Sequence, residues 1–507
     1  MPHFTPTRAL VVLTSFVLLG FLWTRGLPHQ YAGPALPALT HLAEPVVDNV
    51  GNGGKEHGKG TSTPPKTKIA PVPTKAADVS SEKSCKEARG AQHVMVVVRT
   101  SRAGVESGLP PHLLKLLACA HHVLIFSDHA GETNGYPIHD ALHLTPNTTM
   151  AKHAEFVEYD KMQADKNHKP TLDKANALDK WKWLPMVYTT ATIAPNHRFY
   201  MFVEPDTSLS WTNLLQWLDR LDYRIPYYSG VPNTVDDTRY AQHGPGIMLS
   251  YGALQQYWPR YEELYASDWE PQVATACCGD VVLARAMKQA QIEFYSSFGL
   301  LDPEMPSNLI WGQKFWCTPV VSWHHLPRAD ADLLWDTQEA WARKHGWAKP
   351  WTHHDAYETF VKEQLAEQKE DWDNVSSDTQ LVADKGRRER LTHQKQPTNA
   401  TPHGSKDTQA PSNPAKRDEA LDTLVQAAAD SPASCRAMCL QTDDCLQWKH
   451  NTAGDGTCHL GKALRLGGKV ATPDKAARWT SGWMLDRVGR LAEEWGRCER
   501  VEWKFNQ

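Results

Sequence analysis

The sequence has little excess of either charge. Across 507 residues, 54 basic side chains stand against 58 acidic ones, which gives a formal net charge of −4. Because a basic field is needed to hold a nucleic-acid backbone, DNA or RNA is not an expected partner. The chain also has only one long apolar run, which excludes a polytopic membrane protein. Its 10 cysteines are too few for a small disulfide scaffold, although they suffice for bridges in an oxidising compartment.

The composition that is present indicates a folded enzyme-sized protein. Hydrophobic residues make up 41% of the chain, which excludes wholesale disorder. At roughly 150 residues per domain, the length allows two or three domains. The 20 tryptophans are a high number, and core packing is the first interpretation of them. Platforms for sugar rings are the alternative.

The apolar run lies at the N-terminus. Ala9–Trp23 contains no charged residue and is flanked by Arg8 and Arg25. A helix of this length covers about 22 Å, which suits the thin membranes of the early secretory pathway. We predict a cytosolic tail over residues 1–8 and an uncleaved signal anchor over residues 9–24. A cleaved signal peptide is the competing interpretation, and both deliver the rest of the chain to the secretory lumen.

Three Asn-x-Ser/Thr sequons agree with a lumenal location. Asn147, Asn374 and Asn399 each begin one, and we predict them as glycosylation sites. Residues 25–84 are rich in proline and glycine and have little apolar periodicity, which predicts a flexible stem.

From Cys85 the pattern becomes that of an α/β domain. Residues 94–98 and 123–126 are short apolar runs typical of buried strands, with a helical pattern between them. Arg99, Thr100 and Asp128 follow these strands. In open α/β sheets ligands bind at the carboxyl ends of the strands, so the three are candidate ligand contacts, with ordinary loop positions as the alternative.

A third predicted strand, residues 198–203, runs directly into Glu204-Pro205-Asp206-Thr207. Two carboxylates spaced two residues apart beyond a strand end can bind a hard divalent cation. Taken alone, this tetrad is also compatible with a simple proline turn. Further along, a glycine-punctuated loop at residues 243–246 precedes another strand, and Asp280 opens a helix where an N-cap or first-turn acid belongs.

These blocks together resemble the fungal branch of glycosyltransferase family 31, relatives of Fringe and the core 1 β1,3-galactosyltransferase. The segment 202–207, continued by 211–218, resembles the family's Asp-rich metal motif and the helix after it. The resemblance extends from about Val94 to His325. It implies a GT-A fold, a Rossmann-like αβα domain that uses a nucleotide-sugar donor.

The resemblance also implies roles for single residues. Arg99, Thr100 and Asp128 would contact the nucleotide, with Glu204 as a further donor contact. Glu204-Pro205 stands where relatives more often have aspartates.

In this family the last acid of the metal motif and a later histidine bind Mn²⁺ (or Mg²⁺). Here these positions correspond to Asp206 and His324, with His325 as an alternative to His324.

The remaining roles concern the acceptor. Asp280 resembles the general base of this inverting family, and His243, Gly244 and Gly246 resemble its acceptor-side loop.

The C-terminal third divides into two regions. Residues 346–420 are charged and proline-dotted, which predicts a linker that begins with a solvated helix. In residues 421–507 the spacing of Cys435, Cys439, Cys445 and Cys458 resembles a PAN/apple domain, which implies a disulfide-pinned α+β module that binds carbohydrate or protein. Each region, 85–345 and 421–507, contains five cysteines, so either two thiols are free or one bridge joins the regions.

The leading hypothesis is an inverting, metal-dependent hexosyltransferase (EC 2.4.1-type), with residues 85–345 as its catalytic domain. It would transfer a hexose from a UDP-sugar to a glycan or glycoprotein acceptor, forming a β1,3-type linkage. It would be a single-pass type II protein of the Golgi membrane with a lumenal catalytic domain, or a secreted protein if the N-terminus is cleaved. The second hypothesis is a catalytically inactive glycan-binding protein that retains the same fold.

Overall fold

The computed structural model describes residues 85–386 and 423–505, except residues 166, 347–348 and 471–475. The predicted cytosolic tail, signal anchor and stem lie outside the described residues, as does Asn399. Within the described ranges, no helix has both the length and the apolar character needed to cross a membrane.

A nine-stranded mixed sheet forms the centre of the first part of the chain. In spatial order its strands are β10 (Phe294–Ser296), β7 (Tyr228–Val235), β9 (Ile247–Ser250), β5 (Phe199–Val203), β1 (Val94–Arg99), β2 (His122–Ser127), β4 (Tyr136–Asp140) and β3 (Gly131–Thr133), with β8 (Thr238–Gln242) paired to β7. Strands β5, β1, β2 and β4 are parallel, whereas β9 runs antiparallel to β5. The predicted α/β class with a parallel central sheet is confirmed.

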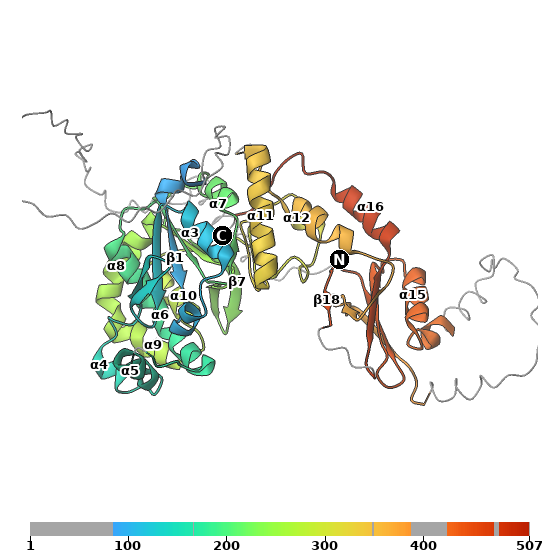
Figure 1. Cartoon of the computed structure of the whole chain (residues 1–507), viewed down its shortest axis with the longest axis horizontal. Helices are drawn as coiled ribbons and strands as arrows, with labels where there is room; N and C mark the ends of the chain where they lie inside the picture. The colour runs from blue at the N-terminus through green and yellow to red at the C-terminus, as the bar shows by residue number, and fades with distance from the viewer. Residues whose placement is uncertain (1–84, 166, 347–348, 387–422, 471–475, 506–507) are drawn as a thin grey trace, which may run out of the picture. The chain divides into compact units, whose positions relative to one another are not determined.

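Helices cover both faces of this sheet (Figure 1). Every residue of β1 is buried, because alternate side chains enter two different cores. Met95 and Val97 pack with one set of helices, and Val96 with the other. The first set is α5 (Phe156–Ala164), α6 (Leu172–Ile193), α8 (Tyr251–Leu264) and α10 (Gly279–Gln289), and the second is α3 (Pro111–Cys119) and α7 (Trp211–Leu218).

Smaller elements complete this part of the chain. A three-stranded sheet consists of β11 (Leu301–Asp302), β12 (Ser322–Trp323) and β6 (Ser208–Leu209). The shorter helices are α2 (Arg102–Glu106), α4 (Asn147–Met150) and α9 (Glu270–Thr275), and they are followed later by α11 (Arg328–His345) and α12 (His353–Phe360).

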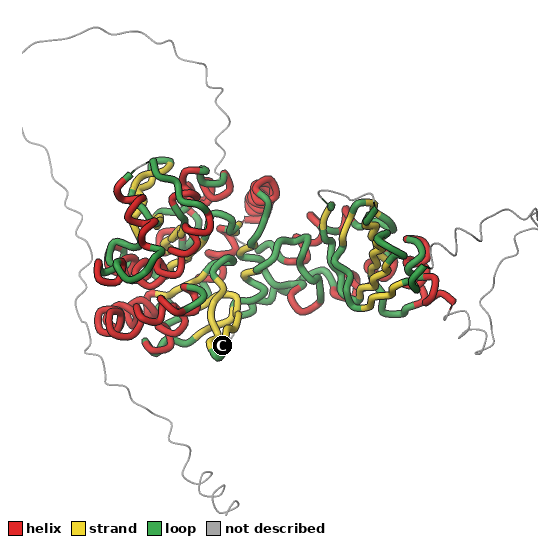
Figure 2. Tube along the Cα trace, turned by 90° about the horizontal axis from the view of Figure 1, so that it is seen from below, coloured by secondary structure: helices red, strands yellow, loops and turns green. Residues whose placement is uncertain are grey.

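The described part of the predicted linker over residues 346–420 contains strands as well as the helix expected at its start. Residues 353–360 form α12, and two later segments pair with the terminal sheet, whose strand order is β13-β19-β16-β17-β15. Figure 2 shows the strands of the chain in yellow. These strands are β13 (Lys369–Glu370), β15 (Thr379–Val382), β16 (Gln447–Asn451), β17 (Thr457–Gly461) and β19 (Trp479–Trp483), while β14 (Trp372–Asp373) pairs with β18 (Gly468–Lys469). The added strands are short, largely solvent-exposed edge strands, so they lack the apolar pattern that marks a buried strand.

Four disulfides cross-link the described chain. Cys85–Cys119 lies in the first part, and Cys435–Cys458 and Cys439–Cys445 join α15 (Pro432–Gln441) to the segments that follow it. Cys317–Cys498 joins the two regions, with α16 (Leu485–Trp495) just before Cys498. Cys277 and Cys278 are free. The five-and-five division of the cysteines thus has both predicted consequences, a bridge between the regions and two free thiols.

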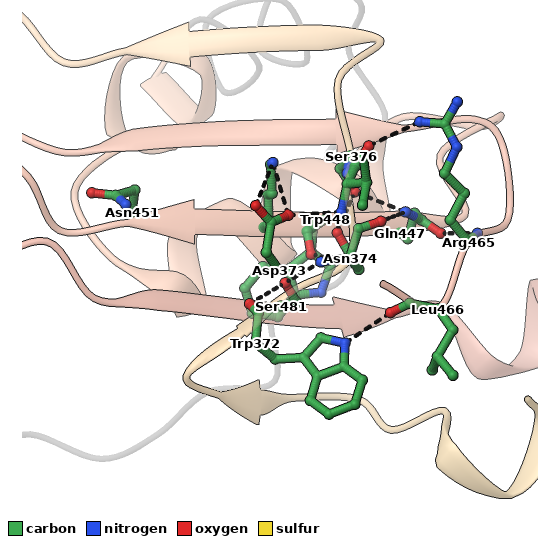
Figure 3. Close-up of polar contacts among 12 residues, drawn as sticks. Trp372, Asp373, Asn374, Ser376, Gln447, Trp448, Asn451, Arg465, Leu466 and Ser481 are labelled. Carbon is green, nitrogen blue, oxygen red and sulfur yellow. Dashed lines mark hydrogen bonds and ion pairs between the residues drawn. The ribbon is translucent and has the colours of Figure 1, made fainter. Parts of the chain in front are cut away.

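Asn374 is a correction to the predicted glycosylation sites. Its side chain is fully buried where residues 372–376 cross the terminal sheet (Figure 3). Its amide donates to the carbonyls of Trp448 at 3.0 Å and Gly482 at 3.3 Å, and its Oδ1 accepts from Ser376 Oγ at 2.8 Å. No room remains for a glycan in the folded protein. Asn147, in contrast, is exposed at the start of α4.

We therefore predict that Asn374→Ala lowers the free energy of unfolding by about 2–4 kcal/mol, since it removes the buried hydrogen bonds of the Asn374 amide to Trp448, Gly482 and Ser376. Urea denaturation of the terminal sheet measures this change. Asn147→Ala, an exposed sequon position, is the matched control and leaves the stability unchanged. Equal stabilities of the two variants, or a glycan on Asn374 in peptide mapping of the folded protein, would contradict the assignment.

Candidate functional site

The parallel strands bring the predicted polar residues to one edge of the sheet. Arg99 ends β1, Asp128 follows β2, and Glu204 follows β5. The register aligns these ends, since Val98 pairs with both Ile125 and Val203. The carboxyl ends of the central strands therefore form a charged surface, as the α/β pattern predicts.

A chain of buried charges runs along this edge. Arg99, only 5% exposed, donates to Glu204 and lies 3.4 Å from Asp179 on α6. Lys182, which is fully buried, lies 2.6 Å from Asp179 and 3.2 Å from Asp128. Burial opposes the charge on Arg99, but the Glu204 and Asp179 carboxylates outweigh it and raise its pKa.

Asp179 and Lys182 are absent from the sequence prediction. The sequence indicates them only through their spacing, because they are two charged residues three positions apart on a helix whose neighbouring residues are buried. A charged side chain at such a position requires a partner of opposite charge. Burial raises the pKa of Asp179, but the positive charges of Lys182 and Arg99 lower it by more, so the pKa lies below its ordinary value. Asp179 therefore stays charged and holds Arg99 in place, and Lys182 pairs with Asp179 from the other side.

Asp128 lies behind this surface and not on it. It is fully buried, and its Oδ1 accepts from the Arg102 backbone N–H at 2.7 Å while its Oδ2 faces Lys182. A direct ligand contact of Asp128 is therefore not supported by its position. Thr100 is 8% exposed, and its carbonyl accepts from Lys182 at 3.1 Å. Of the three predicted strand-end contacts, only Arg99 lines the adjoining cavity.

A second cluster forms around Asp206. The turn after β5 is held by Thr207 Oγ1, which accepts from the Glu204 backbone N–H at 3.0 Å and donates to the Gly244 carbonyl at 2.7 Å. Antiparallel pairing of β6 with β12 places Trp323 opposite Ser208, so that His324 reaches Asp206. His324 Nε2 lies 3.1 Å from Asp206 Oδ2.

Glu204, Asp206 and His324 can share one cation, because one ligand atom from each lies within 4.8 Å of the others. His324 is 7% exposed, its Nε2 contacts Asp206, and its Nδ1 has no hydrogen-bond partner. A buried polar atom without a partner is costly unless an ion or water satisfies it. Two carboxylates and one imidazole suit a divalent cation such as Mn²⁺.

The geometry also distinguishes His324 from His325. His325 is exposed and adopts a left-handed conformation with φ 61°, whereas His324 is buried against the Asp206 turn. Burial raises the pKa of Asp206, but the neighbouring His324 lowers it more, which keeps the carboxylate ionised. His324 is thus the histidine placed to act with Asp206.

The glycine-containing loop between β8 and β9 packs against this cluster. A Cβ on Gly244 would overlap the His324 ring, and Gly246 has φ 106°, a conformation that side chains rarely adopt. Ser322 Oγ donates to the Pro245 carbonyl at 2.5 Å. The two glycines therefore allow the loop to support the histidine.

His243 begins this loop and connects the two carboxylates expected to carry chemistry. Its Nδ1 lies 2.7 Å from Asp280 Oδ2, and its Nε2 lies 3.6 Å from Glu204 Oε2. Burial lowers the pKa of His243, but the Asp280 hydrogen bond and the Glu204 carboxylate outweigh it, so the net direction is upward. Asp280 is 2% exposed, and its Oδ1 accepts from the Val281 backbone N–H at 2.9 Å. His243, 37% exposed, is the member of the pair that ligands can reach.

A cavity of about 450 Å³ adjoins these groups. Its walls include Arg99, Asp179, Trp183 and His243, together with the loop before α10. The Arg99 guanidinium lies 5.1 Å from the centre of the Trp183 ring. The volume lies within the ~300–1,000 Å³ range of small-molecule sites. A polar cavity with an aromatic wall suits a sugar or a nucleotide.

Comparison with protein-family models and with curated proteins finds no match to this chain. The assignment of a function therefore rests on the site geometry and on the motif resemblance.

The cation site predicts a specific effect of Gly244→Ala. The added methyl group displaces the His324 ring, and Mn²⁺ affinity falls about 10–100-fold, the usual effect of disturbing a residue that orients a ligand. Titration calorimetry with Mn²⁺ measures it. The control is Gly131→Ala, where the added Cβ meets nothing within 4 Å. Unchanged affinity in Gly244→Ala would exclude His324 as a ligand.

Proposed function

We propose that this protein is an inverting, metal-dependent glycosyltransferase of the GT-A type in family 31. It transfers a hexose from a UDP-sugar to a glycan or glycoprotein acceptor, with a β1,3-type linkage. The observation that carries the proposal is the Glu204–Asp206–His324 cluster beside a polar cavity, at the carboxyl ends of parallel strands.

In this proposal the donor is bound by two groups of residues. Asp206 and His324 would hold Mn²⁺ (or Mg²⁺), which when bound would supply positive charge to neutralise the leaving diphosphate. Arg99 lines the cavity as a fixed cation for the donor, and Thr100 and Asp128 support the surface behind it. Glu204 orients Arg99 and also faces the cation site.

The acceptor hydroxyl gives its proton to the His243–Asp280 pair. Both oxygens of Asp280 already accept hydrogen bonds, so the carboxylate acts through the histidine, holding Nδ1 and stabilising the imidazolium that forms. Inversion follows from attack of the acceptor oxygen on the face of the sugar carbon opposite the departing diphosphate.

The location proposed is the Golgi lumen, with a single-pass type II anchor or, as the alternative, a secreted form. Four disulfides support an oxidising compartment. The terminal sheet with its two local disulfides is proposed as a PAN/apple-like module that binds carbohydrate or protein.

One observation favours the alternative of a catalytically inactive glycan-binding protein. Glu204 is already paired with Arg99, and Asp280 is paired with His243. The carboxylate of the unusual Glu204-Pro205 motif is therefore engaged in a contact within the protein. Asp206 remains the accessible carboxylate of the cation cluster, with 51% of its side chain exposed. An inactive protein would retain the cavity and its aromatic wall for glycan binding.

A donor screen with Mn²⁺ separates the two functions. We expect the full-length chain to release UDP from one UDP-hexose, and Asp206→Asn to lose activity about 100-fold or more, because the cation loses a charged ligand. Asp336→Asn, which alters an exposed carboxylate paired with Lys115, is the control and retains activity. Saturable glycan binding without UDP binding or release would establish the inactive alternative instead.

The raised pKa of His243 predicts the pH dependence of transfer. A base must be neutral, so kcat/KM falls as the pH drops through the His243 pKa, which lies above the ordinary value of about 6.5. Asp280→Asn removes the group that raises this pKa. It moves the acidic limb to lower pH and lowers the maximal rate about 10²–10⁴-fold.

Rate profiles of the wild type, Asp280→Asn and His243→Gln measure this effect. His243→Gln should lose the acidic limb altogether. An acidic limb that persists unchanged in His243→Gln would show that another group accepts the proton.

A further inference from the structure

Two adjacent thiols lie in the cavity wall. The other eight cysteines form disulfides, whereas Cys277 and Cys278 are free. Both belong to the short connection between α9 and α10, three and two residues before Asp280, whose carboxylate contacts His243. Both line the cavity together with Arg99, Trp183 and His243.

The two sulfur atoms are close to each other and one of them is accessible. Cys278 Sγ lies 2.6 Å from Cys277 Sγ. Cys277 is exposed, whereas Cys278 is half-buried. Burial, followed by the contact with Cys277 and the charge of Asp280, raises the pKa of Cys278 to about 12. The accessible thiol of Cys277 is therefore the one that reacts first with an external reagent.

We propose that Cys277 and Cys278 form a reversible vicinal disulfide that changes the cavity wall and lowers activity when it closes. The modification site stands on the geometry of the pair, and its regulatory effect rests on the proposed glycosyltransferase function.

A bond between neighbouring residues is easily reversed. Consecutive Cα atoms are ~3.8 Å apart, below the ~4.4 Å lower limit of ordinary disulfides. In the four structural disulfides the two Cα atoms are 5.0–5.4 Å apart. A strained, accessible disulfide is more readily reduced than a relaxed one, which is typical of regulatory bonds.

The oxidant is a low-molecular-weight disulfide such as oxidised glutathione. The Cys277 thiolate attacks one sulfur of this reagent, forms a mixed disulfide and releases one thiol. Cys278 Sγ then attacks Cys277 Sγ and releases the second thiol. The protein loses two protons and two electrons, and the reagent gains both.

Ring closure acts on the cavity because the next residue cannot move. A Cβ on Gly279 would lie 2.6 Å from Trp183 Cδ1 and 2.7 Å from the Lys180 carbonyl, so the start of α10 is packed tightly on α6. The backbone change of the ring is absorbed by Ala276, Cys277 and Cys278, all of which line the cavity. Acceptor and donor positions next to His243 change as a result.

The test combines peptide mapping with activity. The full-length chain is treated with oxidised glutathione, its free thiols are alkylated, and peptides are analysed without reduction. We expect the wild-type peptide to carry no alkyl group and to weigh less than the dithiol by the mass of two hydrogen atoms. Mild dithiothreitol restores two alkylated thiols while the four structural bridges stay closed. Cys278→Ser stops at a glutathione adduct on Cys277.

Activity provides the second measurement. UDP-hexose transfer falls about tenfold or more on oxidation and recovers on mild reduction, since small displacements of positioning groups have effects of this size. Transfer by the Cys277→Ser/Cys278→Ser double variant does not respond to the oxidant. A wild-type peptide that remains doubly alkylated, or that retains glutathione on Cys277, overturns the disulfide.

The two proposals fail in different ways. Disulfide formation without transfer in either redox state leaves the modification site standing and defeats the glycosyltransferase function. Transfer that is equal in the oxidised and reduced proteins overturns the regulatory effect.

Discussion

The ion pairs around Arg99 are the interaction on which the site depends. Asp128, Lys182, Asp179, Arg99 and Glu204 alternate in sign along the carboxyl edge of the sheet, and most of them are out of contact with water. Breaking a buried pair by removing one partner typically costs ~3–5 kcal/mol, because the remaining charge stays buried. The network therefore fixes β1, β5 and α6 relative to one another. It also sets the direction of Glu204, which faces both His243 and the cation cluster.

The Glu204–Asp206–His324 cluster depends on uncharged contacts, namely hydrogen bonds, strand pairing and close packing. Asp206 is placed by the Thr207 hydrogen bonds, and His324 by the pairing of β12 with β6 and by the close approach of Gly244. A ligand held by backbone geometry loses little entropy when a cation binds. The acidic turn and the histidine of this candidate site come from segments more than a hundred residues apart.

Sequence alone predicted those elements that appear as continuous apolar runs followed by polar residues. The buried valines of β1 and the polar residues beyond β1, β2 and β5 were visible because parallel strands bury both faces. Asp179 and Lys182 were missed, since a charged pair on a helix is usually solvent-exposed and only the tertiary contacts with Arg99 and Asp128 give it a role. Asn374 was misassigned because a sequon carries no information about burial. The edge strands β13 and β15 were taken as linker because they are short and largely exposed, so they show no apolar pattern.

The terminal module also contributes to the site through packing. Trp323, which directly precedes His324, is fully buried in a cluster that includes Trp316, Leu464 and Trp483. Leu464 and Trp483 belong to the terminal region. The Cys317–Cys498 disulfide also links this region to the first part of the chain, as does the pairing of Trp311 with Leu464. The orientation of His324 therefore depends on residues far beyond the first part of the chain. Core packing explains these tryptophans, and also Trp183, which lines the cavity with only 2% of its surface exposed.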